Sequence, residues 1–379
     1  MQSVESVARP MVTRRAVART VLAAVAVVAL ASCSQQEGNQ AQGTDGPDAS
    51  STGLVVRGAG ATFPKPLYEK WISIYGKQTP DVSFEYAGVG SGKGIQMFLA
   101  GKDPDGTVFD GAEIDFGASD AAMSDADLAK VGERGAVMVP MTGGMVVLAY
   151  NLPGVEELKL SREAVQGIFN GEIQNWNDPL IAASNPDLDL PNRSITPVVR
   201  RDSSGTTFIM TSHLAAVSPA WRNGPGVGKQ IDWPGSTMQV NYNSGVAQRV
   251  KVSEGAIGYM EYEFAERLGL PIATLQNKAG EYVKPTPVAG SAALASAPSI
   301  PDDLRVFVPD PPGAGAYPIA GYTWLLLYQH YPDTAKRDAL KGAVLWGLNE
   351  GQPVAEEMGY IPLPTEMVRL ARAKVDAID

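Results

Sequence analysis

Four short segments of the sequence are built from glycines and hydroxyl residues, and each one follows an apolar run. They read GAGATFP at 58–64, GVGSGKG at 88–94, GASD at 117–120 and RRDSSGTTF at 200–208. Segments of this kind offer backbone N–H groups and hydroxyl donors, which together attract anions. The chemistry that they suggest is the capture of an oxyanion. Each segment taken alone can also be a plain turn.

The segment at 88–94 ends in Gly-Lys, but its spacing is wrong for a nucleotide. A P-loop, G-x-x-x-x-G-K-[ST], needs glycine where the chain has Ala87, and Ser or Thr where it has Gly94. The dinucleotide pattern G-x-G-x-x-G fails because its third glycine would fall on Lys93. The sequence therefore does not predict an ATP or dinucleotide cradle here. We expect Lys93 at a rim or in solvent.

Strands and helices alternate along the chain and place these segments at strand-to-helix junctions. Strands are predicted at 54–57, 82–86, 114–120, 136–140, 145–151, 195–199 and 256–262; the segment 114–120 runs on into a turn and 256–262 into a helix. Helices are predicted after Pro64 or Pro66, at 124–135, at 161–171, from the fourth segment to Val217, and near 333–349 and 364–377. A Pro-, Ala- and Ser-rich connection covers 285–301. This alternation predicts an α/β fold with sheets covered on both faces.

In open α/β sheets a ligand lies beyond the carboxyl ends of the strands. The four segments are therefore expected to converge on one place. They would bring one carboxylate there, Asp120, and at least one arginine, Arg200 or Arg201. They would also bring the hydroxyls of Thr62, Ser91, Ser119, Ser203, Ser204, Thr206 and Thr207.

Together with AIGYMEY at 256–262, these motifs resemble the periplasmic phosphate-binding proteins, the PstS family, of the high-affinity phosphate ABC transporter. They stand in the order of that family and at similar separations, and the resemblance covers nearly all of 54–379. It implies an α/β, two-lobe periplasmic-binding-protein-like (type II) fold with a two-strand hinge and a ligand cleft between the lobes. Lobe I would comprise 54–140 plus 317–379, and lobe II 141–316.

The resemblance also implies a set of phosphate ligands, residue by residue. The family's arginine stands four residues before the ligand serine of the fourth segment, which selects Arg200. At the next position the family usually has a small residue, whereas this chain has Arg201. This second arginine could reach the ligand instead, so Arg201 remains an alternative. Asp202 would pair with the arginine. The implied phosphate ligands are Thr62, the N–H of Phe63, Ser91, Asp120, Arg200, Ser204, Gly205 and Thr206.

Asp120 beside an anion has a physical reason. Phosphate carries at least one proton at neutral pH, and a carboxylate can accept it. Sulfate has no proton there, so its oxygen would face a lone pair and be rejected. The plainer roles remain possible: Asp120 as a helix N-cap or turn residue, and Arg200 in an exposed ion pair with Asp202.

The first residues predict an export address. Residues 1–32 carry four arginines, one glutamate and the apolar stretch 21–31, which together are typical of a signal peptide. Leu30-Ala31-Ser32-Cys33 resembles a lipobox, in which Cys33 would be lipidated; the alternative is an ordinary secretory signal with an incidental cysteine. The polar stretch that follows makes 33–53 a flexible tether. The protein would be held at the outer face of the cytoplasmic membrane, in the periplasm or at the cell surface, after export by the Sec or the Tat route.

Charge and composition narrow the function further. The net charge is −10, and removal of 1–32 with its four arginines and one glutamate leaves −13. Such a surface does not favour nucleic acid, so local donors must bind any anion. The chain has one cysteine and two histidines, so no metal framework and no cofactor are predicted. His213 falls within a helix and is expected to serve packing or lie on the surface.

These observations predict a monomeric, lipid-anchored solute receptor rather than an enzyme. It would capture inorganic phosphate and deliver it to ABC permease subunits in the membrane. The alternatives are a secreted phosphatase-like relative, a binder of another tetrahedral oxyanion such as sulfate or molybdate, and a surface protein that has kept the fold without the ligand.

Overall fold

The structure is a computed structural model, and it describes residues 53–379. The predicted signal peptide 1–32, Cys33 and nearly all of the predicted tether 33–53 lie outside the described residues. The described residues form one compact unit. Within the described part, no helix has both the length and the apolar character needed to cross a bilayer.

Most strands belong to one mixed sheet of eight strands in the order β2-β1-β3-β11-β4-β8-β6-β7, and the other three form a small separate sheet, β10-β9-β5. The strands of the large sheet are β1 Leu54–Gly60, β2 Val82–Gly88, β3 Phe116–Ser119, β4 Ala136–Tyr150, β6 Thr196–Arg200, β7 Met238–Val240, β8 Ala256–Glu261 and β11 Ala320–Tyr328. The strands of the small sheet are β5 Lys159–Leu160, β9 Thr274–Gln276 and β10 Tyr282–Val283.

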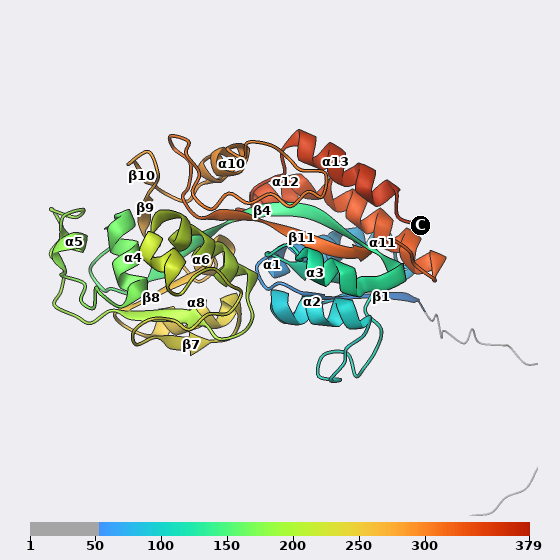
Figure 1. Cartoon of the computed structure of the whole chain (residues 1–379), viewed down its shortest axis with the longest axis horizontal. Helices are drawn as coiled ribbons and strands as arrows, with labels where there is room; N and C mark the ends of the chain where they lie inside the picture. The colour runs from blue at the N-terminus through green and yellow to red at the C-terminus, as the bar shows by residue number, and fades with distance from the viewer. Residues whose placement is uncertain (1–52) are drawn as a thin grey trace, which may run out of the picture. The chain divides into compact units, whose positions relative to one another are not determined.

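The helices cover the faces of the large sheet. Figure 1 shows α4, α6 and α8 grouped around the β6–β8 part and α1, α2 and α11 around the β1–β3 part, with β4 and β11 between them. The helices are α1 Lys65–Tyr75, α2 Ser91–Ala100, α3 Asp125–Leu128 with a 3-10 turn Ala129–Arg134, α4 Arg162–Asn170, α5 Pro179–Ala182, α6 Gly205–Val217, α7 Pro219–Asn223, α8 Tyr242–Val252, α9 Tyr262–Glu266, α10 Pro287–Ala295, α11 Thr334–Gly347, α12 Gly351–Glu357 and α13 Thr365–Asp376.

β4 determines where the loops meet. Its first two-thirds pair antiparallel with β11, up to Met145, and its last residues pair antiparallel with β8, from Val146 to Tyr150. β3 is also antiparallel to β11, so β1, β2 and β3 run in the same direction as β4, whereas β6, β7 and β8 run against it. The carboxyl ends of both sets therefore point toward the middle of β4.

Local sequence explains the helix starts. The side chains of Ser124, Ser161 and Ser204 each accept a hydrogen bond from a backbone N–H of the first turn that follows, as helix N-caps do. Pro66 occupies the first turn of α1, where its missing N–H costs nothing. These were helix starts that the sequence predicted.

Two elements differ from the prediction. Residues 136–151 do not form two strands: β4 runs unbroken from 136 to 150. Pro140 faces Trp324, whereas Thr142 faces Thr323, so Met141 is an extra residue at a bulge. A proline is tolerated at such a bulge, where a ladder hydrogen bond is already missing. The connection 285–301 is not irregular throughout, since it contains α10, which is capped by Thr286.

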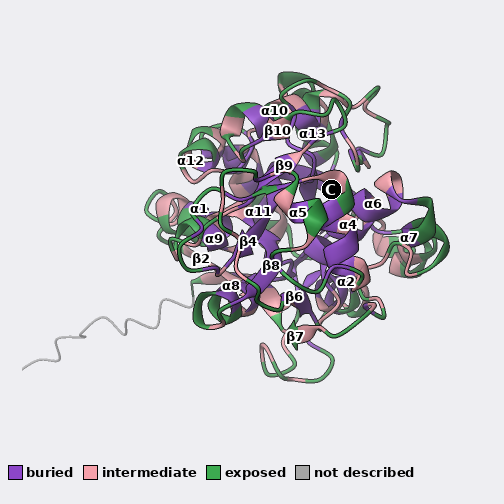
Figure 2. Ribbon diagram, turned by 90° about the vertical axis from the view of Figure 1, so that its left-hand side faces the viewer, coloured by how far each residue is buried: buried purple, intermediate pink, exposed green. Residues whose placement is uncertain are grey.

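The core lies along the central strands. Every residue of β11 and all residues of β4 after Ala136 are buried, which the burial colouring of Figure 2 shows as a purple centre beneath a green and pink surface. Trp176, Trp221 and Trp324 are fully buried, and each indole N–H donates to a backbone carbonyl. A core satisfied in this way holds the loop ends of the strands in fixed positions.

Gly94 and Gly245 give a test of this packing. A Cβ at Gly94 in α2 would lie 2.3 Å from the Cα of Gly60 and 2.9 Å from the carbonyl oxygen of Ala59, both of them backbone atoms. Gly94→Ala is expected to lower the free energy of unfolding by about 2 kcal/mol or more, because backbone cannot move aside. A Cβ at Gly245 in α8 would meet only the Val240 side chain, at 3.6 Å.

Gly245→Ala is the matched control and should leave stability unchanged or raise it by up to about 1 kcal/mol, because alanine is the better helix former. Urea unfolding of phosphate-free protein, followed by tryptophan fluorescence, measures both values. Equal effects of the two substitutions would contradict the close packing of α2 on β1.

Candidate functional site

Thr62 and Phe63 lie in the first loop, directly after β1. Both residues are buried, and the Phe63 carbonyl accepts a hydrogen bond of 2.9 Å from the Tyr360 hydroxyl. The Phe63 ring occupies the space beside Gly144, where a Cβ would come within 2.4 Å of it. Among residues 53–379 no acceptor meets the Phe63 N–H. The loop is thus fixed from behind, and one backbone donor remains free.

Ser91 is the first residue of α2 and is fully buried. Its Oγ accepts a hydrogen bond from the N–H of Asp120, at 3.2 Å, and another from the N–H of Gly205, at 3.1 Å. Gly205 begins α6 in the fourth loop, which belongs to the other set of strands. The second, third and fourth loops therefore touch one another at this single hydroxyl.

Asp120 follows β3 and is almost completely buried. Its Oδ1 accepts a hydrogen bond of 2.8 Å from the hydroxyl of Thr323 on β11, and Oδ2 lies 3.5 Å from the Ser91 Oγ. Burial raises the pKa of Asp120 to about 7, against the lowering effects of the Thr323 hydrogen bond, the Arg200 charge and Ser91. Asp120 therefore offers one oxygen, Oδ2, to the site, on a carboxyl group that gains and loses its proton near neutral pH.

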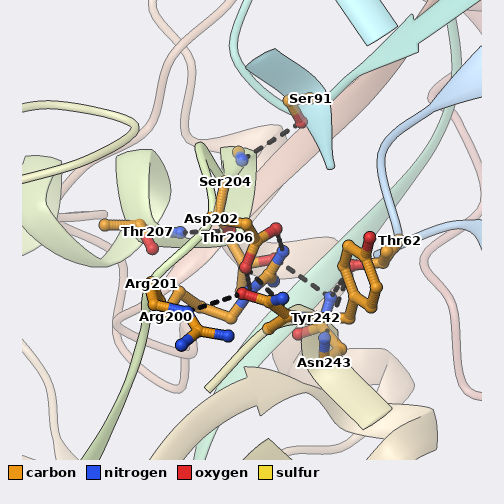
Figure 3. A network of polar contacts seen from close by, with 12 residues as sticks. Thr62, Ser91, Arg200, Arg201, Asp202, Ser204, Thr206, Thr207, Tyr242 and Asn243 are labelled. Atoms are coloured by element: carbon orange, nitrogen blue, oxygen red, sulfur yellow. Dashed lines mark hydrogen bonds and ion pairs between the residues drawn. The ribbon is translucent and has the colours of Figure 1, made fainter. Parts of the chain in front are cut away.

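Arg200 ends β6, and the two arginines of the fourth loop have different surroundings (Figure 3). The Arg200 side chain is buried and forms two hydrogen bonds to Asp202, Nε to Oδ1 at 2.7 Å and Nη2 to Oδ2 at 2.5 Å. Its Nη1 lies 3.5 Å from the Thr206 Oγ1. Arg201 is exposed, and its Nε donates to Asn241. Asp202 is thus the partner of Arg200, as expected, and Arg200 rather than Arg201 lies beside Thr206.

Ser204, Gly205 and Thr206 form the start of α6 and are buried. The Ser204 Oγ accepts a hydrogen bond of 3.1 Å from the Thr207 N–H and so caps the helix. The Thr206 Oγ1 lies 3.5 Å from the Arg200 Nη1 and 3.2 Å from the Asn243 Nδ2. Backbone N–H groups at a helix start carry partial positive charge, which favours a bound anion.

Asn243 completes the contact between the two sets of loops. It lies at the start of α8, directly after β7, and is fully buried. Its Nδ2 is 3.0 Å from the Thr62 Oγ1 and 3.2 Å from the Thr206 Oγ1. The residue before it, Tyr242, has φ +67°, a left-handed conformation that is costly for a bulky side chain. Its N–H donates to Asp202 at 3.0 Å.

The geometry agrees with what known proteins show. A family model described as a PBP superfamily domain matches residues 34–342. A protein of Pasteurella multocida named phosphate-binding protein PstS is 36% identical over 323 residues, covering 84% of this chain and 89% of that protein. One with the same name from Methanocaldococcus jannaschii is 35% identical over 379 residues and covers 93% of each chain.

The chain belongs to the PstS family.

Solved structures agree with this assignment at the level of fold. A high-affinity periplasmic phosphate-binding protein solved with bound phosphate superposes with a TM-score of 0.69 at 24% identity, covering 84% of this chain and 93% of that one. A phosphate-binding protein from Stenotrophomonas maltophilia gives 0.66 at 21% identity, with the same coverage. The predicted two-lobe α/β fold is confirmed; the exact lobe boundaries, 54–140 plus 317–379 and 141–316, remain a prediction.

All eight residues that the PstS resemblance selected lie around the carboxyl ends of β1, β2, β3 and β6, and the hydrogen bonds above connect most of them. Their role as ligands remains a prediction. Lys93 lies outside the network, with its Nζ 3.1 Å from Asp105 and 2.6 Å from Thr107. His213 is buried in packing, its Nδ1 2.9 Å from the Pro309 carbonyl oxygen, and burial lowers its pKa to about 4.

Two residues that hydrogen-bond to the predicted ligands were missed from the sequence, Asn243 and Thr323. Asn243 has a weak signal, because it follows a short strand at a strand-to-helix junction as the other four loops do. Thr323 lies inside an apolar strand and has no signal of its own. Among residues 53–379, no three His, Cys, Asp or Glu side chains are grouped so as to hold a metal ion.

The pKa of Asp120 predicts how stability depends on pH without ligand. The pKa is about 7 in the folded chain against an ordinary value of 3.8, so between these values the native state holds this proton more tightly than the unfolded state. Stability from this group is therefore present at low pH and is lost as pH rises through 7. At pH 8, Asp120→Asn should stabilise the ligand-free protein relative to wild type, by an amount on the order of 3 kcal/mol.

The measurement is thermal unfolding of both proteins in phosphate-free buffer from pH 5 to pH 8. Thr323→Val is a second variant. It removes the hydroxyl that favours the carboxylate and so raises the pKa of Asp120 further, and the loss of stability between low and high pH should be larger than in wild type. Parallel curves for wild type and Asp120→Asn would contradict the assigned proton.

Proposed function

We propose that the protein is a solute-binding protein that captures inorganic phosphate between its two lobes and delivers it to an ABC importer. The observation that carries the proposal is the arrangement of donors around a single acceptor. Asp120 Oδ1 accepts from Thr323, and Oδ2 lies 3.5 Å from the Ser91 Oγ, which accepts from the Gly205 N–H. Thr206, in the same first turn of α6 as Gly205, lies beside the Arg200 guanidinium. A ligand that accepts hydrogen bonds on most sides and donates one proton fits this arrangement, as monohydrogen phosphate does.

The residues proposed as phosphate ligands are those that the resemblance selected. The N–H of Phe63 and the hydroxyls of Thr62, Ser91, Ser204 and Thr206 would donate, with Arg200 adding a charge-assisted contact. The Gly205 N–H, which donates to the Ser91 Oγ in this structure, would exchange that hydrogen bond for one to the phosphate. Asp120 would accept the phosphate proton. Relatives named phosphate-binding protein PstS, at 36% and 35% identity, support phosphate as the ligand.

The address is part of the proposal. We place the mature protein outside the cell, anchored by lipid on Cys33 and linked by 33–53 to the folded part, where it would meet permease subunits as a monomer. The export signal and lipobox at the start of the sequence support this. We assign binding rather than catalysis, because the relatives that are 36% and 35% identical are named binding proteins.

Selectivity tests the proposed ligand. At pH 8, where the carboxylate form of Asp120 predominates, calorimetry should give phosphate binding and at least about 100-fold weaker sulfate binding, because a sulfate oxygen would face the Asp120 lone pair. Asp120→Asn should narrow this ratio at least about tenfold by admitting sulfate. Equal affinity of the wild type for both anions would show that Asp120 does not select the ligand.

The two neighbouring arginines give a matched pair of variants. Arg200→Ala should weaken phosphate binding by about 100-fold or more, because it removes the buried charged donor and leaves Asp202 facing the site. Arg201→Ala, a change of the same type one residue along on an exposed side chain, should change affinity by less than about threefold. The reverse order of effects would assign the ligand role to Arg201.

A further inference from the structure

Asn243 is the only fully buried amide side chain among residues 53–379 that reaches two of the proposed ligand hydroxyls. The hydroxyls come from different sets of loops: Thr62 follows β1, and Thr206 lies in the first turn of α6. Figure 3 shows Asn243 below both, on the side away from Ser91. Its position raises the question of which atom of the amide faces the threonines.

A backbone contact answers that question. The N–H of Glu261, the last residue of β8, points at one end of the Asn243 amide at 3.1 Å. An N–H can only donate, so the atom it meets must be the amide oxygen, Oδ1. The other end is then the NH2 group, which has two protons and no lone pair to offer. One proton serves Thr62 and the other serves Thr206.

Each threonine oxygen therefore accepts, and each has a second donor. The backbone N–H of Asn243 also points at the Thr62 Oγ1, at 3.4 Å. The Arg200 Nη1 is the second donor at the Thr206 Oγ1, at 3.5 Å. A hydroxyl oxygen has two acceptor positions and one proton. Both acceptor positions are therefore occupied. Each hydroxyl can only donate its proton, and it does so on the side away from Asn243.

At Ser91 too, both acceptor positions of the hydroxyl are filled, in this case by backbone N–H groups. Its Oγ accepts from the N–H groups of Asp120 and Gly205, so its proton too must be donated, and in this structure it is directed at Asp120 Oδ2, at 3.5 Å. A hydroxyl proton otherwise rotates to suit its surroundings and can turn a lone pair toward an anion. At these three hydroxyls the rotation is restricted before any ligand arrives.

We propose that Asn243 is a positioning residue that fixes the proton direction of Thr62 and Thr206, so that both hydroxyls face the bound anion as donors. This inference rests on the proposed phosphate-binding function and adds a selectivity element to it. The site then offers donors from both lobes and one acceptor, Asp120 Oδ2. Tyr242 supports the assignment, because its strained backbone is held by the Asp202 carboxylate and sets the start of α8.

The test replaces the NH2 group of Asn243, which donates, by a carboxylate oxygen, which accepts. In Asn243→Asp the carboxylate can still accept from the Glu261 N–H, but it must also accept from both threonines and so turns their protons away from the ligand. Phosphate affinity, measured by calorimetry on the purified chain at pH 8, should fall by at least about 100-fold. Asn243→Ala adds no charge and frees both hydroxyls to rotate. Its phosphate affinity should be about tenfold lower than that of the wild type.

Asn277 supplies the matched control. It is also fully buried, with its Oδ1 accepting the Glu281 N–H at 3.0 Å and its Nδ2 facing the carbonyls of Ala316 and Gly313. Asn277→Asp carries the same chemical change outside the ligand loops, so it should cost stability yet leave phosphate affinity within about twofold of wild type. An equal loss of phosphate affinity in both Asn→Asp variants would show that Asn243 supports the fold and does not orient the two hydroxyls.

A mutant cycle separates positioning from general support. If Asn243 acts through the hydroxyls, Asn243→Ala should weaken binding no further once Thr62→Val and Thr206→Val are present. Losses that multiply would overturn the proposal, as would an Asn243→Ala chain that binds like wild type. If the Asn243→Asp chain does not fold, the alanine variant and the cycle decide. A wild type that binds no phosphate would refute the proposed function itself, which is a different outcome.

Discussion

The path of β4 through the middle of the sheet is the constraint on which the site depends. Because β4 pairs with β11 along one part and with β8 along the other, strands of opposite direction are hydrogen-bonded to a single continuous segment. The carboxyl ends of β1, β2 and β3 therefore face those of β6, β7 and β8. Loops far apart in sequence are brought close enough to share one hydroxyl, as Ser91 and Gly205 do.

Burial then determines the chemistry of the shared volume. Arg200 is already paired with Asp202, and the whole chain is negative, so neither provides a free positive field for an anion. Beyond the Arg200 contact, attraction has to come from oriented dipoles at helix starts and from buried hydroxyls. Such groups recognise where a ligand carries its lone pairs and its proton, which is a finer property than its size or charge.

The sequence predicted the parts of this site that sit in recognisable surroundings. Short runs of glycine and hydroxyl residues after a strand can be recognised in the sequence alone. Such runs contain Thr62, Ser91, Asp120 and the segment 200–208. Thr323 and Asn243 were missed for a physical reason: they act on residues 203 and 181 positions away, and only the sheet order brings them together.

The two errors in the elements have local causes. The sequence predicted two strands, 136–140 and 145–151, where there is one. The bulge that tolerates Pro140 arises from pairing with β11 and leaves no mark in the sequence. The helix α10 was hidden in a stretch rich in Pro, Ala and Ser, where Thr286 and Pro287 turn out to be a cap and a first-turn proline.

Gly144 carries a consequence for how such a protein could change over evolutionary time. The Phe63 ring rests where any side chain at 144 would have to go, within 2.4 Å of a first carbon atom. A single added methyl group there would push on the loop of Thr62 and Phe63 from beneath, without altering any of the eight residues proposed as ligands. Affinity could therefore be retuned by mutations at positions that never meet the ligand, and a comparison of ligand residues alone would not detect it.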